Sequence, residues 1–543
     1  MTVSKESFDY VVVGSGSAGS IVASRLSEDG RSTVCVVEAG GSDGSIWLKI
    51  PVGYARSYYD PTVNWMYRTE PEAELGGRRI YAPRGKVQGG SGAINAMIFV
   101  RGAASDFDGW RDAGNPGWGH ADVLPHFKRL ERHVRGASAF HGGDGPIGVT
   151  PMRGATHPIC DAFLSACRDL QLPATDDFNG AAIEGAGIYD VNTRRGLRSS
   201  SGAAYLRPAL RRSNVEILRH ARATRIRFDA ERRATGVEIV RNGERRILEA
   251  RREVIVCAGA VDTPKLLQLS GLGDGAMLRA KGIETRHHLP AVGRNLQDHL
   301  CASFYYRATV PTLNGPFSSL FGQARLALQY ALTRKGPFAM SVNQAGGFFR
   351  GRPSEARENL QLYFNPLSYR IPDDPKAGLK AEPYPGFLLA FNACRPTSRG
   401  TIEIASPDAE APPEIRPNYL STEHDRDEAV QGARLARRIM EMPTLRAITE
   451  VEMPPSADAS SSDELLAYFR ENCGSIYHLC GSAAMGPDAS TAVVDARLRV
   501  HGIPGLRVVD ASTFPRITAG NINAPTMMVA EKGAAMIRED ALA

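Results

Sequence analysis

The stretch 8–40 constrains the fold of this chain more than any other part of the sequence. A short apolar run, 9–13, has the composition of a buried parallel strand and leads into Gly14. Gly16 and Gly19 follow, and the three glycines have the spacing G-x-G-x-x-G. The first glycine permits a tight turn, the second lets the backbone approach a pyrophosphate, and the third allows the next helix to pack closely on the strand. The pattern predicts a phosphate-binding turn.

The residues after these glycines complete a larger unit. The spacing of the apolar residues predicts a helix over about 18–28, whose N-terminal amides would point at the phosphates. A second strand, about 33–37, ends at Glu38, which lies 19 residues after Gly19. An acidic side chain at this place can accept hydrogen bonds from ribose hydroxyls. Together these elements predict a dinucleotide site, and this stretch alone leaves NAD and FAD open.

Length and composition exclude several classes of protein. The 543 residues are too many for one core and predict roughly three to four domain-sized units. The net charge of +6 is spread along the chain without a basic stripe, so we expect no nucleic-acid partner. No run of about 18 apolar residues occurs, and the short stretch before the first strand leads us to expect no secretory segment. We expect a cytoplasmic protein without a transmembrane segment, and peripheral membrane contact stays open.

The cysteines and histidines do not predict a metal site. The eight cysteines include no C-x-x-C pair, so we expect reduced thiols rather than a disulfide framework. His126, His133 and His141 are isolated in the sequence, and we expect surface or structural roles for them.

A second glycine-rich segment, 80–102, implies a backbone that packs tightly against something flat or charged. By itself a structural turn would explain it equally well. It contains Gly85-Lys86, Gly89-Gly90-Ser91, Asn95 and Arg101-Gly102. In these residues it closely resembles the first motif of the glucose–methanol–choline (GMC) oxidoreductases, which are FAD enzymes that oxidise alcohols. The resemblance implies that this loop lies along the flavin and the pyrophosphate.

The segment departs from the family motif at two positions. Gln88 stands where an aliphatic residue is usual, and Gly92 stands where a serine is common. Neither change removes the backbone geometry. Some relatives, the choline oxidases among them, attach FAD covalently through a histidine just before the asparagine, and this chain has Ile94 there. The resemblance therefore implies noncovalent FAD.

Two later segments extend the resemblance, which covers 8–537 in parts. The segment 252–273 reads as strand, glycine turn and helix, and it matches the second motif of the family in full. VGRNLQDH, at 292–299, is a further family segment. The implied fold is α/β plus α+β. It has a discontinuous, doubly wound FAD-binding domain of the Rossmann type, and a substrate domain built on a large antiparallel sheet.

The expected FAD-binding domain comprises 1–155, 196–308 and 465–543, and the expected substrate domain comprises 156–195 and 309–464. Amphipathic helices are predicted at 156–172 and 423–442, and alternating polar and apolar residues predict antiparallel strands over 214–251.

The resemblance also implies a set of FAD-contacting residues in all three FAD-binding segments. They are Gly14, Gly16, Ser17, Ala18, Gly19, Glu38, Ala39, Trp65, Arg84, Gly85, Val87, Gly90, Ser91, Asn95, Ala96, Met97, Ala223, Ala258, Tyr477, Asp510, Ala511, Asn523 and Thr526.

The C-terminal segment carries the residues expected to do chemistry. In the family, a Tyr-His pair places a histidine over the flavin, and a His or Asn some forty residues later lies opposite; these positions are His478 and Asn521 here. Alcohol oxidation by hydride transfer requires a base for the hydroxyl proton, and imidazole suits that task near neutral pH. The developing alkoxide needs a donor, which an Asn amide can supply. We therefore expect His478 as general base and Asn521 as its partner.

The substrate is less constrained. Choline-oxidising relatives hold the trimethylammonium group with an acidic residue soon after NLQDH, but 300–310 contains no Asp or Glu and has Arg307. Choline is therefore disfavoured. An outward salt bridge is the expected role of Arg307, and attraction of an anionic group on the substrate is the alternative. Aromatic residues suggest a pocket for a neutral aliphatic or aromatic alcohol, although core packing would explain each of them equally well. They are Tyr477, Phe348, Tyr363 and Phe364.

The leading prediction is an FAD-dependent dehydrogenase or oxidase that converts a primary alcohol to the aldehyde. Electrons would pass to a quinone, another carrier or dioxygen; Ile476, beside the catalytic pair, is compatible with dioxygen access. A non-redox flavoenzyme of the same fold, either a hydroxynitrile lyase or a fatty-acid photodecarboxylase, is the alternative. An NAD-binding regulatory or structural protein is a third possibility, and it predicts a colourless preparation. The identity of the alcohol, the acceptor, the oligomeric state and the pathway stay open.

Overall fold

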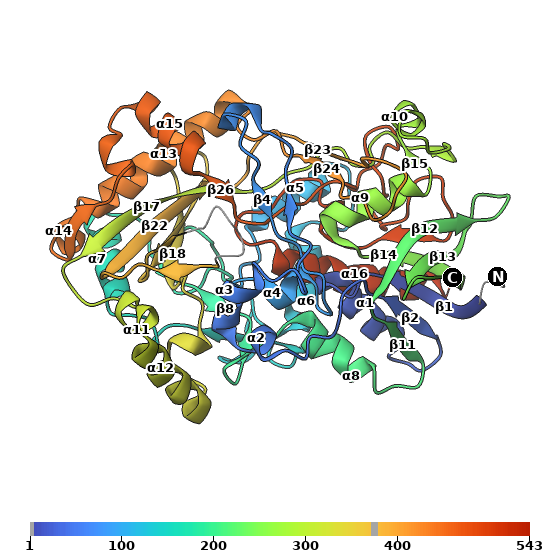
Figure 1. Cartoon of the computed structure of the whole chain (residues 1–543), viewed down its shortest axis with the longest axis horizontal. Coiled ribbons are helices and arrows are strands. Elements are labelled where there is room, and N and C mark those ends of the chain that lie inside the picture. Colours follow the sequence, from blue (N-terminus) through green and yellow to red (C-terminus); the bar gives the residue numbers. More distant parts are fainter. Residues whose placement is uncertain (1–4, 371–377, 543) are drawn as a thin grey trace.

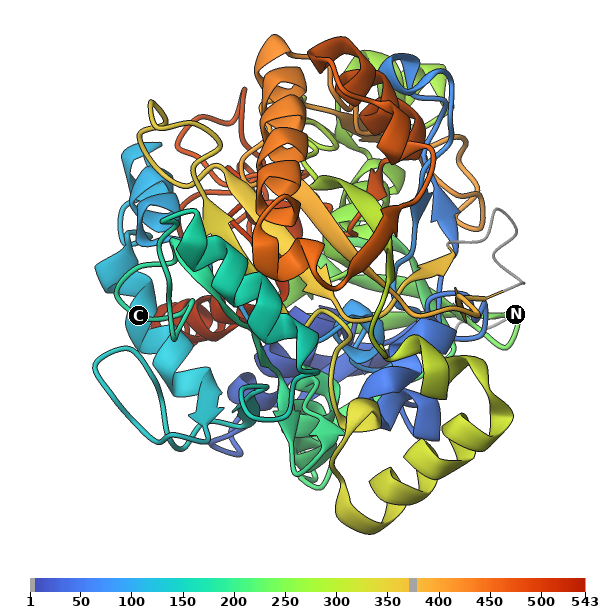
Figure 2. The same ribbon diagram turned by 90° about the vertical axis from the view of Figure 1, so that its left-hand side faces the viewer.

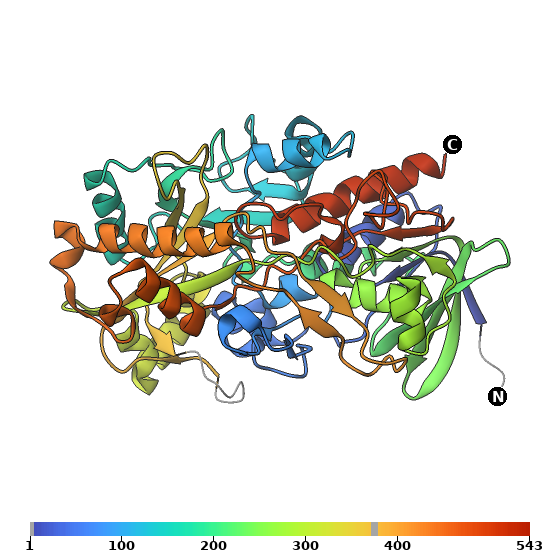
Figure 3. The ribbon, with the colours of Figure 1, turned by 90° about the horizontal axis from the view of Figure 1, so that it is seen from above.

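The computed structural model describes residues 5–370 and 378–542. Two large sheets lie toward opposite ends of an elongated molecule, and both ends of the chain lie at the same end (Figure 1). Seen from above, helix α13 (Glu423–Met440) covers one end, and helix α16 (Asn523–Asp540) runs over the other (Figure 3).

The first sheet has seven strands in the order β11-β2-β1-β14-β13-β12, with β27 paired to β14. The strands are β1 (Lys5–Val13), β2 (Val34–Val37), β11 (Val215–Leu218), β12 (Ala221–Phe228), β13 (Ala234–Arg241), β14 (Glu244–Val256) and β27 (Leu506–Val508). The pairs among β11, β2, β1, β14 and β27 are parallel, whereas β12, β13 and β14 pair antiparallel. The first sheet confirms the predicted Rossmann-type unit.

The predicted glycine turn explains how the first sheet and its helix fit together. Helix α1 (Ser17–Leu26) begins directly after the turn and packs against the C-terminal helix α16. A Cβ atom on Gly19 would lie 1.9 Å from the carbonyl oxygen of Gly14, so only glycine allows this approach of helix to strand. Gly14 itself has φ +98°, a conformation that other residues rarely adopt.

One part of the strand prediction is wrong. The segment 214–251 was expected to form only antiparallel strands, but β11 pairs parallel with β2, in the register Val215 to Val34. The alternation of polar and apolar residues indicates that one face of a strand is buried, but it carries no information on whether the partner strand runs parallel or antiparallel.

The second sheet has the order β25-β17-β22-β19-β18-β7, with β26 paired to β17, and it is antiparallel throughout. Its strands are β7 (Gly185–Ile188), β17 (Leu300–Ala308), β18 (Ala345–Phe349), β19 (Leu360–Asn365), β22 (Gly386–Ala393), β25 (Thr449–Glu452) and β26 (Gly474–Ser475). Helices α7 (Ile159–Asp169), α13 and α15 (Ser462–Asn472) contact these strands, and Figure 2 shows α13 lying across the sheet. The predicted antiparallel substrate domain is confirmed.

The second sheet does not follow two of the expected domain boundaries. Strand β17, which ends at residue 308, was expected in the FAD-binding domain, but it pairs with β22, β25 and β26 in the second sheet. Strand β26 belongs to the same sheet although it lies after residue 464. Strand pairing is a long-range property, so composition along the chain could not place these boundaries.

The remaining helices and strands are mostly short. The helices are α2 (Ile46–Lys49), α3 (Tyr54–Ser57), α4 (Ser91–Ile94), α5 (Ala104–Asp112), α6 (His120–Leu130), α8 (Arg207–Ala209), α9 (Gly259–Leu269), α10 (Gly275–Ala280), α11 (Asn314–Ser318), α12 (Leu320–Thr333) and α14 (Pro443–Arg446). A π-helical turn, η3 (Gly202–Leu206), precedes α8, and a small sheet joins β5 (Glu131–His133), β6 (Ile147–Pro151) and β8 (Asp190–Val191). Within the described ranges, no helix combines the length and the apolar composition needed to cross a membrane.

Candidate active site

A cavity of about 1450 Å³ extends from the glycine turn of the first sheet to one face of the second sheet. Gly14 and Gly16 line it on the first-sheet side. On the second-sheet side, alternate residues of β17 and β19 line it, as expected for the residues on one face of a sheet: Cys301, Ser303, Tyr305, Tyr363 and Asn365.

The glycine end of the cavity has the features that a dinucleotide requires. Gly90 has φ +54°, and a Cβ atom there would lie 2.6 Å from the Cα atom of Gly16. The backbones of the two loops therefore approach so closely that no side chain fits between them. The first turn of α1 adds backbone N–H groups that suit phosphate oxygens. The carboxylate of Glu38 is buried and lines the cavity, and it accepts hydrogen bonds from the backbone N–H groups of Ser15 (3.1 Å) and Gly40 (2.7 Å). These bonds hold the carboxylate where ribose hydroxyls would reach it.

The expected FAD-contacting residues lie together around this cavity, apart from two. Those that line it are Gly14, Gly16, Ser17, Ala18, Glu38, Ala39, Trp65, Arg84, Gly85, Gly90, Ser91, Asn95, Ala96, Met97, Ala223, Ala258, Tyr477, Asp510, Ala511, Asn523 and Thr526. Gly19 and Val87 are not among the lining residues. Gly19 acts through helix packing, and the side chain of Val87 is buried in an apolar cluster with Leu48, Ala93 and Ile94. Direct cofactor contact by these two residues stays a prediction.

Two polar side chains of this set are already fixed by the protein. Asp510 accepts hydrogen bonds from the N–H of Gly259 (2.8 Å) and the hydroxyl of Thr263 (2.6 Å), and so joins β27 to α9. The Oδ1 atom of Asn523 accepts a hydrogen bond from the hydroxyl of Ser17 (2.7 Å), and so joins α16 to the start of α1. Asn523 therefore ties the phosphate-binding turn to the C-terminal helix, and Asp510 ties the C-terminal segment to the start of α9.

At the other end of the cavity, His478 and Asn521 lie side by side. The Nδ2 atom of Asn521 is 3.2 Å from the Nε2 atom of His478, and both residues line the cavity. The Oδ1 atom of Asn521 accepts a hydrogen bond from the hydroxyl of Tyr363 at 3.4 Å. The Asn521 amide is therefore oriented with its NH₂ group toward His478.

His299 makes a second contact to His478, and the sequence analysis assigned it no role. The Nδ1 atoms of His299 and His478 are 2.9 Å apart, and the Nε2 atom of His299 is 2.8 Å from the carbonyl oxygen of Cys394. A carbonyl oxygen only accepts, so His299 carries its hydrogen on Nε2. Burial lowers the pKa of His299 to about 4, so its ring is neutral and its Nδ1 accepts. His478 must then carry its hydrogen on Nδ1.

This chain of hydrogen bonds leaves Nε2 of His478 unprotonated at the cavity, where it accepts from the Asn521 amide and is the ring atom that can take up a proton. Burial of the ring, followed by the nearby His299 and the positive charge of Arg84, lowers the pKa of His478 well below its usual value. The imidazole is therefore neutral at physiological pH. A neutral ring with a fixed tautomer is the state that a general base needs.

The backbone around His478 is held in an unusual conformation. Tyr477 has φ +72°, which is rare for a residue other than glycine. Its carbonyl oxygen accepts a hydrogen bond from Arg84 Nη2 at 2.5 Å, and its N–H donates to Ser475 Oγ at 2.8 Å. The N–H of His478 donates to the buried carboxylate of Asp298 at 2.7 Å. Both Asp298 and His299 come from the NLQDH segment, which therefore positions the Tyr-His pair.

The four aromatic residues expected in the substrate pocket divide into two pairs. Tyr363 and Tyr477 line the cavity, whereas Phe348 and Phe364 are fully buried elsewhere, so the prediction for these two is wrong. Phe364 lies on the opposite face of β19 from Tyr363 and stacks on Phe163 of α7, with ring centroids 5.1 Å apart. Successive side chains of a strand point to opposite faces, which separates these neighbours.

Phe348 lies on the cavity-facing side of the second sheet but beyond the end of the cavity. It pairs with Gln361 across the sheet, and its ring packs against Phe178 at a centroid distance of 5.5 Å. A Cβ atom on Gly520 would lie 3.0 Å from the ring of Phe348. Phe348 therefore supports the loop before Asn521 from behind.

Arg307 points away from the cavity. Its side chain is half exposed, pairs with Glu450 at 3.2 Å, and lies over the ring of Tyr384. The predicted outward salt bridge is confirmed. An acidic side chain outside 300–310, that of Glu382, lines the cavity.

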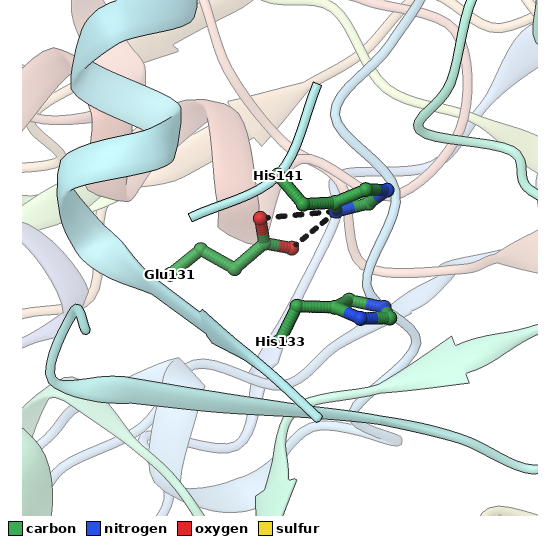
Figure 4. Close-up of side chains that lie close together, drawn as sticks. All are labelled: Glu131, His133 and His141. Atoms are coloured by element: carbon green, nitrogen blue, oxygen red, sulfur yellow. Dashed lines mark hydrogen bonds and ion pairs between the residues drawn. The ribbon is translucent and has the colours of Figure 1, made fainter. Parts of the chain in front are cut away.

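A buried cluster outside the cavity was also missed. His133 and His141, isolated in the sequence, lie with their ring centroids 4.3 Å apart beside Glu131 (Figure 4). The carboxylate of Glu131 accepts hydrogen bonds from Arg101 (2.5 Å) and His141 (3.1 Å), and the other ring nitrogen of His141 is 2.6 Å from Asp177.

The charges of this cluster favour an ion-pair network over a metal site. Burial opposes the charged ring, but hydrogen bonds to Asp177 and Glu131 outweigh it and raise the pKa of His141 to about 9. At neutral pH, both ring nitrogens of His141 are therefore protonated donors, which leaves no lone pair for a metal ion. The guanidinium of Arg101 adds a positive charge beside the same carboxylate.

Comparisons with known proteins extend over nearly the whole chain. The GMC oxidoreductase family models match residues 8–301 and 396–530. An oxygen-dependent choline dehydrogenase from Vibrio vulnificus is 40% identical over 536 residues, which cover 98% of this chain and 94% of the relative. The structure of pyridoxine 4-oxidase from Mesorbium loti is 30% identical, with a TM-score of 0.88 and coverage of 98% of this chain and 99% of that one. A formate oxidase from Aspergillus oryzae RIB40 is 26% identical, with a TM-score of 0.90 and 99% coverage of both chains.

Proposed function

Because the chain belongs to the GMC oxidoreductase family, we propose that it oxidises a primary alcohol to the aldehyde, with His478 as the general base. The observation that carries the proposal is the hydrogen-bond chain from Cys394 through His299 and His478 to Asn521. It leaves an unprotonated ring nitrogen beside an amide donor on the wall of the cavity. Base and donor are the two groups that alcohol oxidation requires.

FAD is the cofactor of this family, and it supplies, when bound, the acceptor for the hydride. The glycine contacts, the start of α1 and Glu38 would hold its phosphates and ribose. The Nε atom of Arg84, buried at the cavity wall, has no hydrogen-bond partner among the described residues and can donate to a bound group. Ile94 lines the cavity and offers no nucleophile, which supports noncovalent binding.

The protein's own residues would act on the hydroxyl group of the substrate. His478 Nε2 accepts the hydroxyl proton as the C–H bond breaks, and Asn521 Nδ2 donates a hydrogen bond to the substrate oxygen. The positive charge that forms on the His478 ring is stabilised through its Nδ1–H, which donates to His299. Tyr363 keeps the Asn521 amide in the donating orientation.

We propose a neutral aliphatic or aromatic alcohol as the substrate, since apolar and tyrosine side chains form much of the cavity wall at the His478 end. One observation favours a second candidate, a cationic amino alcohol. Glu382 and several tyrosines, among them Tyr58, Tyr305 and Tyr369, line the cavity, and aromatic faces with a carboxylate attract quaternary ammonium groups. The choline dehydrogenase relative is in accord with this candidate.

The experiment is an anaerobic titration of the yellow holoprotein with benzyl alcohol, hexanol and choline, followed by admission of air. We expect the flavin absorbance to bleach with benzyl alcohol or hexanol at lower concentration than with choline; the reverse order would establish the cationic substrate. Fast return of the yellow colour with peroxide would indicate an oxidase, whereas slow return would indicate transfer to a quinone or another carrier. Flavin that no alcohol bleaches would contradict alcohol oxidation and favour a lyase or a photodecarboxylase.

A further inference from the structure

Helix α12 stands out from the body of the protein and exposes an apolar face. With α11 it projects at one edge of the molecule, where Figures 1 and 2 both show it in yellow-green. Only Leu326 and Tyr330 of its 14 residues are buried. Its large apolar side chains are exposed to 86% (Leu320), 83% (Phe321), 61% (Leu328) and 77% (Leu332). A helix of a soluble protein normally turns its apolar face inward, so this orientation calls for a partner.

The exposed face lies at the mouth of the active-site cavity. Leu320 of this face lines that cavity, together with Phe317, Gln323 and Ala327 of α11 and α12. The short helix α2 also lines it and exposes Ile46 (55%) and Trp47 (40%). The two parts are connected, because η1 (Pro51–Gly53), which packs on α2, contacts η4 (Pro337–Ala339), which packs on α12.

The charges around this face are positive. The stretch 299–354 contains no Asp or Glu. Arg325, Arg334 and Lys335 are exposed, and no ion pair joins any of them to another residue in the described part of the chain. Arg56 lies over the ring of Trp47, 4.9 Å from its centroid, and is exposed as well.

We propose that α12 and α2 form a docking face for an anionic phospholipid bilayer, so that the cavity mouth opens at the lipid surface. Leucine, phenylalanine and tryptophan side chains would enter the boundary between headgroups and acyl chains, while arginine and lysine contact the anionic headgroups. A lipophilic alcohol or a quinone could then pass between the bilayer and the cavity without crossing water.

The charges favour lipid over a second copy of this chain. In a symmetric dimer the same patch meets itself, so Arg325, Arg334 and Lys335 would face the same three residues of the other copy. Like charges brought together at an interface oppose association, whereas anionic headgroups neutralise them.

The test is flotation of the FAD-loaded protein with vesicles of phosphatidylcholine, alone or with about 30% phosphatidylglycerol. We expect binding to the anionic vesicles that decreases with salt and is weak with phosphatidylcholine alone. The double variant Phe321→Ser/Leu332→Ser should lower the partition coefficient roughly tenfold or more, and Arg334→Glu/Lys335→Glu should do the same. The matched control is Val134→Ser/Val451→Ser, which replaces exposed apolar residues (64% and 47%) elsewhere and should bind as the wild type does.

Absence of binding to anionic vesicles would overturn the proposal, and so would equal binding by the Phe321→Ser/Leu332→Ser variant. Light scattering on the same samples adds a further outcome. A dimer that dissociates in this variant would assign the face to a second copy and would also overturn lipid docking. Bleaching of the flavin by alcohol is measured without vesicles, and these variants should retain it, so failure of this proposal is distinct from failure of the proposed activity.

Discussion

His299 shows how a residue outside the cavity can decide the chemistry within it. It does not line the cavity, but its Nδ1 atom fixes the tautomer of His478. We predict that His299→Leu retains FAD and lowers the rate of flavin reduction by roughly 10- to 100-fold, because the other tautomer of His478 becomes accessible. His299→Asn, which keeps an acceptor near the Nδ1 position, should restore part of the rate.

The readout for His299 is the rate of flavin reduction in anaerobic stopped-flow, together with its pH profile. If His299 positions His478, the midpoint of the acid limb of the pH profile should shift in His299→Leu. Loss of folding would only lower the yield of yellow protein. An unchanged rate and an unchanged profile in His299→Leu would contradict the role.

The pH dependence of the wild type follows from His478 itself. Burial, with His299 and Arg84 nearby, keeps its pKa well below the usual value of 6.5. Protonation of Nε2 removes the lone pair, so kcat/KM should fall as the pH decreases and stay constant as the pH rises above about 6.5. The acid limb should have its midpoint below this pH in steady-state assays. A midpoint well above it would contradict the electrostatics of the site.

At the scale of the secondary-structure elements, an ion-pair network joins the segment 97–102 to β5 and to Asp177. Replacing Glu131 by Gln leaves the buried guanidinium of Arg101 without its carboxylate. We predict that Glu131→Gln lowers the free energy of unfolding by about 3–5 kcal/mol, measured by urea denaturation. Glu70→Gln is the matched control, because the side chains of Glu70 (28% exposed) and its partner Arg79 (51% exposed) reach solvent, and it should cost about 1 kcal/mol or less. Equal effects of the two changes would show that burial does not determine the strength of the pair.

The sequence predicted those elements whose signals are local. The strand, the glycine turn, the helix and Glu38 lie within about thirty residues, and the physical reason for each glycine applies at short range. His478 and Asn521 came only from the family resemblance. Their distance of 3.2 Å depends on two loops that are 43 residues apart.

Contacts between distant segments could not be predicted. His299 and His478 are 179 residues apart, and nothing in either segment alone shows that they meet. Tyr363 and Phe364 are neighbours in a strand whose residues are buried on both faces, so burial alone could not show which of the two faces the cavity. The pairing of β17 with the second sheet has the same long-range origin.

At the scale of the whole molecule, the cavity brings together residues of both sheets and of the N-terminal and C-terminal segments. FAD bound there would stabilise all of them at once. We predict that removal of FAD lowers the melting temperature, and that FAD at about 100 times its Kd restores roughly 2.7 kcal/mol of stability. Riboflavin, which lacks the pyrophosphate, should restore less. Equal melting temperatures with and without FAD, in scanning calorimetry, would contradict a cofactor site between the two sheets.

The most direct test of the proposed mechanism compares His478→Ala with the wild type. Both proteins are loaded with FAD, matched by flavin absorbance, and mixed anaerobically with the best alcohol substrate in a stopped-flow instrument. If His478 accepts the hydroxyl proton, the rate of flavin reduction should fall by roughly 10²- to 10⁴-fold while FAD stays bound. A rate within about threefold of the wild type would show that another group takes the proton and would contradict the mechanism.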